Sequence, residues 1–92
     1  MNTPQFYYLY ILKSQKTGKL YIGQTQNLEE RLSRHNQGRE KYTRKGLPWM
    51  LLYAKTFKER RVAMMWERKL KSWKSPKRVL AWIEREKLIN NG

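Results

Sequence analysis

The segment Leu20–His35 constrains the fold most, because it joins a strand-like stretch to a helix whose phase can be read directly. Asn27 is a preferred helix N-cap residue, and Glu30 follows three positions later as in a variant of the capping box. A helix that starts there carries one stripe at the spacing i, i+3, i+4 and i+7, made of Leu28, Arg31, Leu32 and His35. A buried arginine and histidine would cost several kcal/mol unless they line a cleft or find partners, so we interpret this face as the wall of a site.

A β-hairpin is predicted ahead of this helix. Residues 6–12 are apolar and aromatic throughout and too few for a typical helix, which predicts a central strand. A polar turn that contains Gly18 leads to a second strand over residues 20–25, so the two strands are expected to be antiparallel. Tyr10 and Tyr21 share a face of this hairpin only if the paired positions sum to an odd number, and the sequence leaves that register open.

The second half of the chain predicts one more strand and two helices. Residues 50–56 have the composition of a strand. Residues 58–73 follow the period of an amphipathic helix. Its stripe consists of Val62, Trp66, Leu70 and Trp73. Ser75 and Pro76 then provide an N-cap and a first-position proline, which predicts a last helix over residues 76–87.

The charge balance indicates a polyanionic partner. The chain carries 21 basic and 7 acidic residues, and this formal net charge of +14 exceeds what solubility requires. Nucleic acid is the favoured partner, and an anionic membrane is the alternative. No apolar run reaches the roughly 18 residues of a membrane span, and the basic residues are not confined to one helix. We therefore expect nucleic acid as the partner and no membrane.

Absent residue types exclude several kinds of site. With no cysteine and one histidine, the chain has no disulfide or thiolate metal site, and a protein-caged zinc is not expected. Every acidic residue is a glutamate and they are scattered, which argues against a two-metal phosphoryl-transfer site. The first residues lack the basic region of a signal peptide, so we expect a cytoplasmic protein. We expect a single domain over residues 1–92, with a core over about 7–73 and a C-terminal helix over about 76–87.

The loop over residues 37–46 gathers positive charge around one aromatic side chain. It contains Arg39, Lys41, Tyr42, Arg44 and Lys45. Such a loop suits the phosphates of a nucleic-acid backbone, with one ring for stacking on a base. A solvated surface loop is the alternative interpretation.

Three polar residues are each open to two interpretations. Glu67 lies at the margin of its helical stripe and is either an exposed ion-pair partner of Lys71 or a ligand of Mg²⁺, which needs only one or two carboxylates. Arg31 is either part of a structural ion pair, for example with Glu67, or a clamp on phosphate charge. His35 is either a hydrogen-bonded, half-buried histidine or part of the site.

Five features of the chain combine into one pattern. They are Tyr10, Tyr21-Ile22-Gly23, Arg31, His35 and Glu67. Together they resemble the GIY-YIG nuclease domain, over nearly the whole chain from about Tyr7 to Trp73, in the form of a small single-domain bacterial-type member. The second half of the family name stands verbatim at residues 21–23, whereas Tyr8-Leu9-Tyr10 replaces Gly-Ile-Tyr. Gln24 departs from the lysine that some members carry after the glycine.

The resemblance implies an α/β fold of the α+β kind, with a three-stranded antiparallel sheet flanked by helices. It also implies an endonuclease that hydrolyses DNA phosphodiester bonds with one metal ion, Mg²⁺ or alternatively Mn²⁺. The implied substrate is DNA, and we expect recognition of branched or flapped structures, a role in repair or recombination, and room for a protein partner. A non-catalytic nucleic-acid-binding module of the same fold is the alternative.

The same resemblance assigns roles to individual residues. Tyr10, assisted by Tyr21, takes a proton from the attacking water, and Arg31 stabilises the pentacovalent phosphate. Glu67 holds the metal ion, and His35 matches a further catalytic position. In addition, Gly23 carries no side chain, so we expect it to let the backbone approach the substrate closely.

Overall fold

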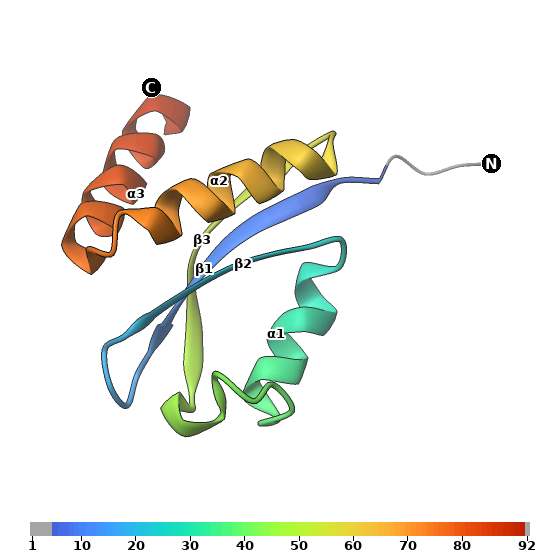
Figure 1. The fold of residues 1–92 in the computed structure, drawn as a ribbon, viewed down its shortest axis with the longest axis vertical. Helices are drawn as coiled ribbons and strands as arrows, with labels where there is room; N and C mark the ends of the chain where they lie inside the picture. The colour runs from blue at the N-terminus through green and yellow to red at the C-terminus, as the bar shows by residue number, and fades with distance from the viewer. Residues whose placement is uncertain (1–4, 92) are drawn as a thin grey trace.

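The structure is a computed structural model that describes residues 5–91 of the chain. Three strands and three α-helices follow one another, with a short 3₁₀ turn, η1, between α1 and β3 (Figure 1). Their bounds in chain order are β1 Tyr7–Ser14, β2 Leu20–Thr25, α1 Leu28–Asn36, η1 Arg44–Gly46, β3 Trp49–Phe57, α2 Arg60–Ser72 and α3 Pro76–Asn91. The described helices lack the length and apolar character needed to cross a membrane.

The sheet is antiparallel and has the order β2-β1-β3, which confirms the predicted central strand and the predicted hairpin. Tyr10 pairs with Gly23 and Leu12 pairs with Tyr21, so the paired positions sum to an odd number. Tyr10 and Tyr21 therefore lie on the same face, which resolves the register that the sequence left open. The strand β2 pairs with β1 alone, so Tyr21 stands on an edge of the sheet.

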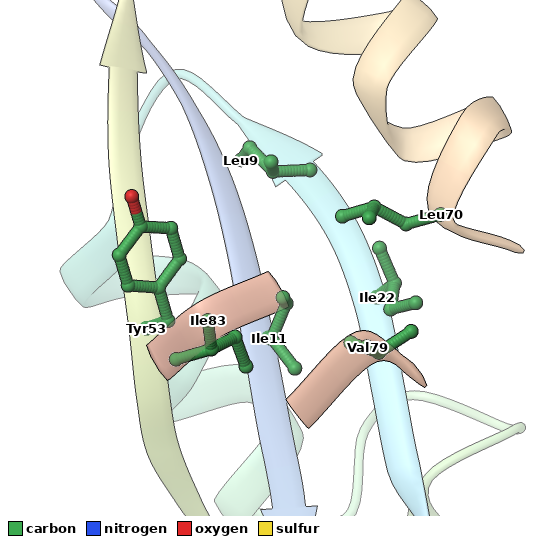
Figure 2. Close-up of a cluster of buried hydrophobic side chains, with 7 residues drawn as sticks. All are labelled: Leu9, Ile11, Ile22, Tyr53, Leu70, Val79 and Ile83. Atoms are coloured by element: carbon green, nitrogen blue, oxygen red, sulfur yellow. The ribbon is translucent and has the colours of Figure 1, made fainter. Parts of the chain in front are cut away.

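The two faces of the sheet are covered by different helices (Figure 1). One face packs against α2 and α3, and Figure 2 shows its side chains meeting between the sheet and these helices. This cluster consists of Leu9, Ile11, Ile22, Tyr53, Leu70, Val79 and Ile83. The other face packs against α1 through Tyr10, Leu12 and Trp49, with Leu28 and Leu32 of the helix against them.

The ends of the helices follow from their capping residues. The side chain of Asn27 accepts a hydrogen bond from the Glu30 backbone N–H at 3.1 Å, as the capping pattern predicts. The Ser75 hydroxyl accepts one from the Arg78 backbone N–H at 3.1 Å and starts α3. The predicted helix over 28–36 is confirmed, α2 is slightly shorter than expected, and α3 continues past Lys87 to Asn91.

Candidate active site

Tyr10, Tyr21 and His35 form an aromatic cluster between the sheet and α1. The ring of Tyr21 lies 6.1 Å from that of Tyr10 and 4.9 Å from that of His35, measured between centroids. Tyr10 and His35 are both 0% exposed, whereas Tyr21 is half-buried at the edge strand. The prediction that His35 lies on the inner face of its helix is therefore confirmed.

A chain of hydrogen bonds runs from Tyr10 through His35 into the following loop. Tyr10 Oη lies 3.0 Å from His35 Nε2, and His35 Nδ1 lies 2.8 Å from the hydroxyl of Thr43. The Thr43 hydroxyl in turn donates to the backbone carbonyl of Glu40 at 3.4 Å. A neutral His35 with its proton on Nδ1 satisfies all three contacts, because Nε2 then accepts from Tyr10 and Nδ1 donates to Thr43.

The surroundings favour the neutral forms of both Tyr10 and His35. Burial, followed by the nearby phenol of Tyr21, raises the pKa of Tyr10 above its ordinary value of 10.0. Burial, followed by the positive charge of Arg31, lowers the pKa of His35 below its ordinary value of 6.5. Tyr10 thus remains a hydrogen-bond donor and His35 an uncharged acceptor at neutral pH.

The structure places the Tyr10 hydroxyl away from solvent. It is fully buried and lies 3.0 Å from His35 Nε2, which suits a positioning role better than contact with an attacking water. Tyr21 is the more exposed tyrosine of the pair. The sequence could not separate the two tyrosines, because their depth depends on the strand order and on the packing of α1.

Gly23 has a packing role that was not predicted from the sequence. A Cβ atom at this position would lie 2.6 Å from Tyr10 Oη and 2.7 Å from the ring carbon that carries it. Gly23 therefore makes room for the phenol of Tyr10, its paired residue on β1. This packing is sufficient to explain why the strand has a glycine here.

Arg31 and Arg34 share one carboxylate from the loop. Glu40 Oε1 lies 3.5 Å from Arg31 Nε and 3.3 Å from Arg34 Nη2. The Nε atoms of both arginines are nevertheless buried without a hydrogen-bond partner among the described residues. Burial opposes the charge of Arg31, but the phenol of Tyr10, Glu40 and the phenol of Tyr21 together raise its pKa. The predicted ion pair of Arg31 is thus real, but its partner is Glu40 rather than Glu67.

Arg31 opens onto a polar cleft of about 300 Å³ beside β2 and the start of α1. Arg34 and Arg60 line the same cleft, together with Gln24 and Glu30. Arg60 begins α2, so the third guanidinium comes from the opposite side of the sheet. Gln24 replaces a lysine that some members of the resembled family carry, and these arginines bring positive charge to the cleft beside it. Three buried or cleft-lining guanidinium groups in one hollow suit a phosphate.

Glu67 lies outside this cleft. Its carboxylate bonds Lys71 Nζ at 2.8 Å, which is the ion pair predicted as the simpler alternative, and its side chain is 22% exposed. Lys71 also lines an apolar hollow of about 270 Å³ beside Tyr21 and Ile22. Through its ion pair with Lys71, Glu67 is linked to a residue that borders the edge strand from the α2 side, while Arg31 lines the cleft beside the same strand on the α1 side. No group of three histidine, cysteine or acidic side chains within residues 5–91 is arranged to hold a metal ion.

The basic loop after α1 is fixed at one point and exposed at the next. Thr43 is fully buried, and its backbone carbonyl accepts a hydrogen bond from the Trp49 indole at 2.6 Å. The adjacent Tyr42 is 89% exposed. The predicted phosphate-binding side chains of this loop are all at the surface, namely Arg39, Lys41, Arg44 and Lys45.

Four residues of the site escaped the sequence reasoning. They are Arg34, Glu40, Thr43 and Arg60. Arg34 follows Arg31 by three positions, a spacing that puts both on neighbouring parts of a helix surface and could have indicated a pair. The other three reach the site through the path of a loop and the start of α2, for which the sequence gives no local signal.

Comparisons with known proteins agree with this architecture. Residues 6–79 match the family described as GIY-YIG catalytic domain. A UPF0213 protein of Bacillus licheniformis is 48% identical over 62 residues, which cover 66% of this chain and 63% of that protein. A UPF0213 protein of Bacillus pumilus is 41% identical over 75 residues, which cover 80% of this chain and 76% of that protein.

A solved structure shares the fold. The solution NMR structure of a UPF0213 protein from Bacillus halodurans superposes with a TM-score of 0.50 and 30% sequence identity. The superposition covers 92% of this chain and 83% of that one. The matched region spans the whole sheet and both sides of the cleft. This chain belongs to the GIY-YIG nuclease family.

Proposed function

We propose that this protein is a Mg²⁺-dependent endonuclease that hydrolyses phosphodiester bonds in DNA. The observation that carries the proposal is the pair of buried guanidinium Nε donors of Arg31 and Arg34. They have no hydrogen-bond partner within residues 5–91, and both arginines line a cleft at the end of β2, the strand that carries Tyr21. A phosphodiester supplies acceptor oxygens for such donors, and its charge grows as the bond is displaced. The net charge of +14 adds attraction for the DNA backbone.

In this proposal, Tyr21 is the general base: its phenol first releases its own proton to solvent, and the resulting phenolate takes the proton of the attacking water. Arg31 lies beside Tyr21, and its positive charge attracts the phenolate. Arg31 also stabilises the phosphate oxygens in the transition state. Tyr10 and His35 act as positioning residues, because their hydrogen bond fixes the two rings against which the Tyr21 ring packs.

Glu67 is the residue that would hold the Mg²⁺ ion. A single, partly exposed carboxylate fits this ion, which takes one or two carboxylates and completes its shell with water and substrate phosphate. When bound, the ion supplies positive charge at the leaving oxygen. Lys71 bonds Oε2 of Glu67, so the other carboxylate oxygen is the one that would bind the ion while the pair stays intact. Mn²⁺ fits the same donor and is the alternative metal.

We further propose that the enzyme recognises DNA shape, such as a branch or a flap, in repair or recombination. A small domain with a phosphate cleft at its sheet edge has little surface left for reading base edges. Its exposed basic loop contacts backbone rather than bases, and a protein partner would add specificity.

The test compares binding and cleavage on plasmid, branched and flapped DNA in the presence of Mg²⁺. Glu67→Gln keeps the shape of the side chain and is expected to retain binding while cleavage falls by about 10²–10³-fold, the loss typical of a group that stabilises transition-state charge. Glu84→Gln is the matched control, since Glu84 is an exposed glutamate on α3 remote from β2. Equal cleavage by Glu67→Gln and the parent would remove the assigned metal role.

One observation favours the alternative of a non-catalytic nucleic-acid-binding module. The 2.8 Å ion pair with Lys71 gives Glu67 a purely structural use. That alternative predicts binding of the same substrates by the parent and by Glu67→Gln, with no Mg²⁺-dependent cleavage by either. A preference for RNA over every DNA form would indicate a third kind of partner.

A further inference from the structure

A second basic and aromatic hollow lies between α2 and α3, which meet at a corner on the far side of the sheet from α1 (Figure 1). Its volume is about 310 Å³, close to the lower end of the range of roughly 300–1,000 Å³ for ligand sites. Three indoles and three cationic side chains line it, namely Trp66, Trp73, Trp82, Lys69, Arg78 and Arg85. No carboxylate is among its lining residues.

The indoles and the cations of this hollow are already in contact. Lys69 Nζ lies 4.8 Å above the ring of Trp66, and the guanidinium of Arg78 lies 4.3 Å above the ring of Trp73. The rings of Trp66 and Trp82 are 5.4 Å apart and tilted by 33°. All three indoles are half-buried, so the core fixes one side of each ring while another side lines the hollow.

This hollow is separate from the candidate active site. Trp66, Lys69 and Trp73 follow the spacing i, i+3 and i+7 and share one side of α2. Glu67 and Lys71 line a different hollow on that helix, and Lys71 also lines the hollow beside β2. The Tyr21 cluster lies across the sheet, under α1. None of the residues assigned to cleavage lines the α2–α3 hollow.

The chemistry of the hollow selects among ligands. Aromatic walls alone suit cationic or apolar groups, but three cations without a carboxylate repel a cation. A nucleotide satisfies both features, because its base can stack on an indole when the lysine or arginine above that ring turns to its phosphate. A half-buried indole is accessible to a base whose face is free, whereas bases inside a duplex have both faces stacked.

We infer that the α2–α3 hollow binds an unpaired nucleotide of single-stranded DNA. The inference deepens the proposed function and rests on it for the identity of the substrate, since a branched or flapped DNA has a single-stranded arm. The binding itself does not require cleavage and is measured without Mg²⁺, so failure of the two proposals can be told apart.

The test removes two cations from the hollow and compares the variant with a matched one. Lys69→Ala/Arg85→Ala changes two exposed side chains that line it. Lys77→Ala/Lys87→Ala changes two exposed lysines of α3 that do not, and lowers the net charge equally. Fluorescence anisotropy with a labelled oligo(dT) and with a hairpin duplex of equal charge then measures both affinities at one low salt concentration.

The expected result is a loss of about tenfold or more in oligo(dT) affinity for Lys69→Ala/Arg85→Ala and a loss of no more than about threefold for the control pair. Duplex affinity is expected to fall equally in both. Trp73→Leu should also weaken oligo(dT) binding, with circular dichroism to show that it folds. Equal losses of oligo(dT) binding in the two double variants would overturn the inference. It would also be overturned if, in a competition experiment, an acidic peptide displaced the labelled oligo(dT) at a lower concentration than unlabelled oligo(dT) does.

Discussion

The side chains of the central strand are equally buried on the two faces of the sheet, but the two faces differ in the types of side chain that cover them. Along β1, Leu9 and Ile11 point to the α2–α3 face, and Tyr10 points to the α1 face, all with 0% exposure. The first face is filled mostly by aliphatic and aromatic side chains (Figure 2), and at its margin the Tyr53 hydroxyl donates to Glu86 at 3.2 Å. The second contains the buried hydrogen-bond chain through His35.

This difference shows how a small domain keeps a reactive site without losing its core. Strand residues alternate between faces, so one strand can supply both a hydrophobic core and the floor of a polar site. The aliphatic face provides stability mainly through buried apolar side chains. The α1 face accommodates buried polar groups: Tyr10, His35 and Thr43 satisfy one another, whereas the Nε atoms of Arg31 and Arg34 lack a hydrogen-bond partner among the described residues.

The largest expected effect comes from a cavity in the aliphatic face. Ile11→Ala should lower the free energy of unfolding by about 2–5 kcal/mol, because it removes buried methyl groups from a filled core. Urea unfolding measures the loss. Cleavage per folded molecule should stay near the parent value, and a fall in that value would contradict the separation of the two faces.

On the α1 face, we expect a loss of function rather than of stability. Arg31→Ala should reduce cleavage by about 10²–10³-fold, since it removes the donor assigned to the transition state. Its effect on the free energy of unfolding should be small, because Arg31 is partly exposed and its ion pair is long. Single-turnover cleavage and urea unfolding test this pair of results, and Arg61→Ala, at an exposed arginine of α2, is the control.

A smaller effect is expected where the two strands of the hairpin touch. Gly23→Ala should lower the free energy of unfolding by about 1–3 kcal/mol, because the added Cβ would lie 2.6 Å from Tyr10 Oη. It should also displace the phenol from His35 and so reduce cleavage. The neighbouring Gln24→Ala serves as the control for strand propensity. Parent-like stability of Gly23→Ala would contradict the proposed packing reason for this glycine.

The smallest effect concerns the pH dependence of stability. Since burial and Arg31 lower the pKa of His35, the unfolded chain binds its proton before the folded one as the pH falls. The stabilising contribution is full above the ordinary value of 6.5 and is lost as the pH drops below it, through the lower folded value. Urea unfolding on both sides of that pH should show this slope in the parent and a reduced slope in His35→Gln. An unchanged slope would be at odds with a neutral, buried His35.

The sequence predicted the elements well where local signals exist. Asn27 and Ser75 indicated the starts of two helices, and the aromatic run over residues 6–12 indicated the central strand. The stripe with Arg31 and His35 indicated a polar site under the first helix, and both side chains lie there.

The remaining features depend on tertiary structure. The register that joins Tyr10 to Tyr21 depends on hairpin pairing, which alternation alone does not specify. Glu40 reaches Arg31 through a loop whose path has no periodic signal, so the sequence does not identify which glutamate pairs with Arg31. The depth of Tyr10 depends on how closely α1 covers β1.

The most direct measurement of the account compares Tyr21→Phe with Tyr10→Phe. Each variant loses one hydroxyl from the same aromatic cluster, and cleavage rates with Mg²⁺ are divided by the folded fraction of each. The account predicts that Tyr21→Phe loses about 10²–10⁴-fold, the range for a general base, while Tyr10→Phe stays within about tenfold of the parent. Parent-like cleavage by Tyr21→Phe, or a larger loss in Tyr10→Phe, would contradict it.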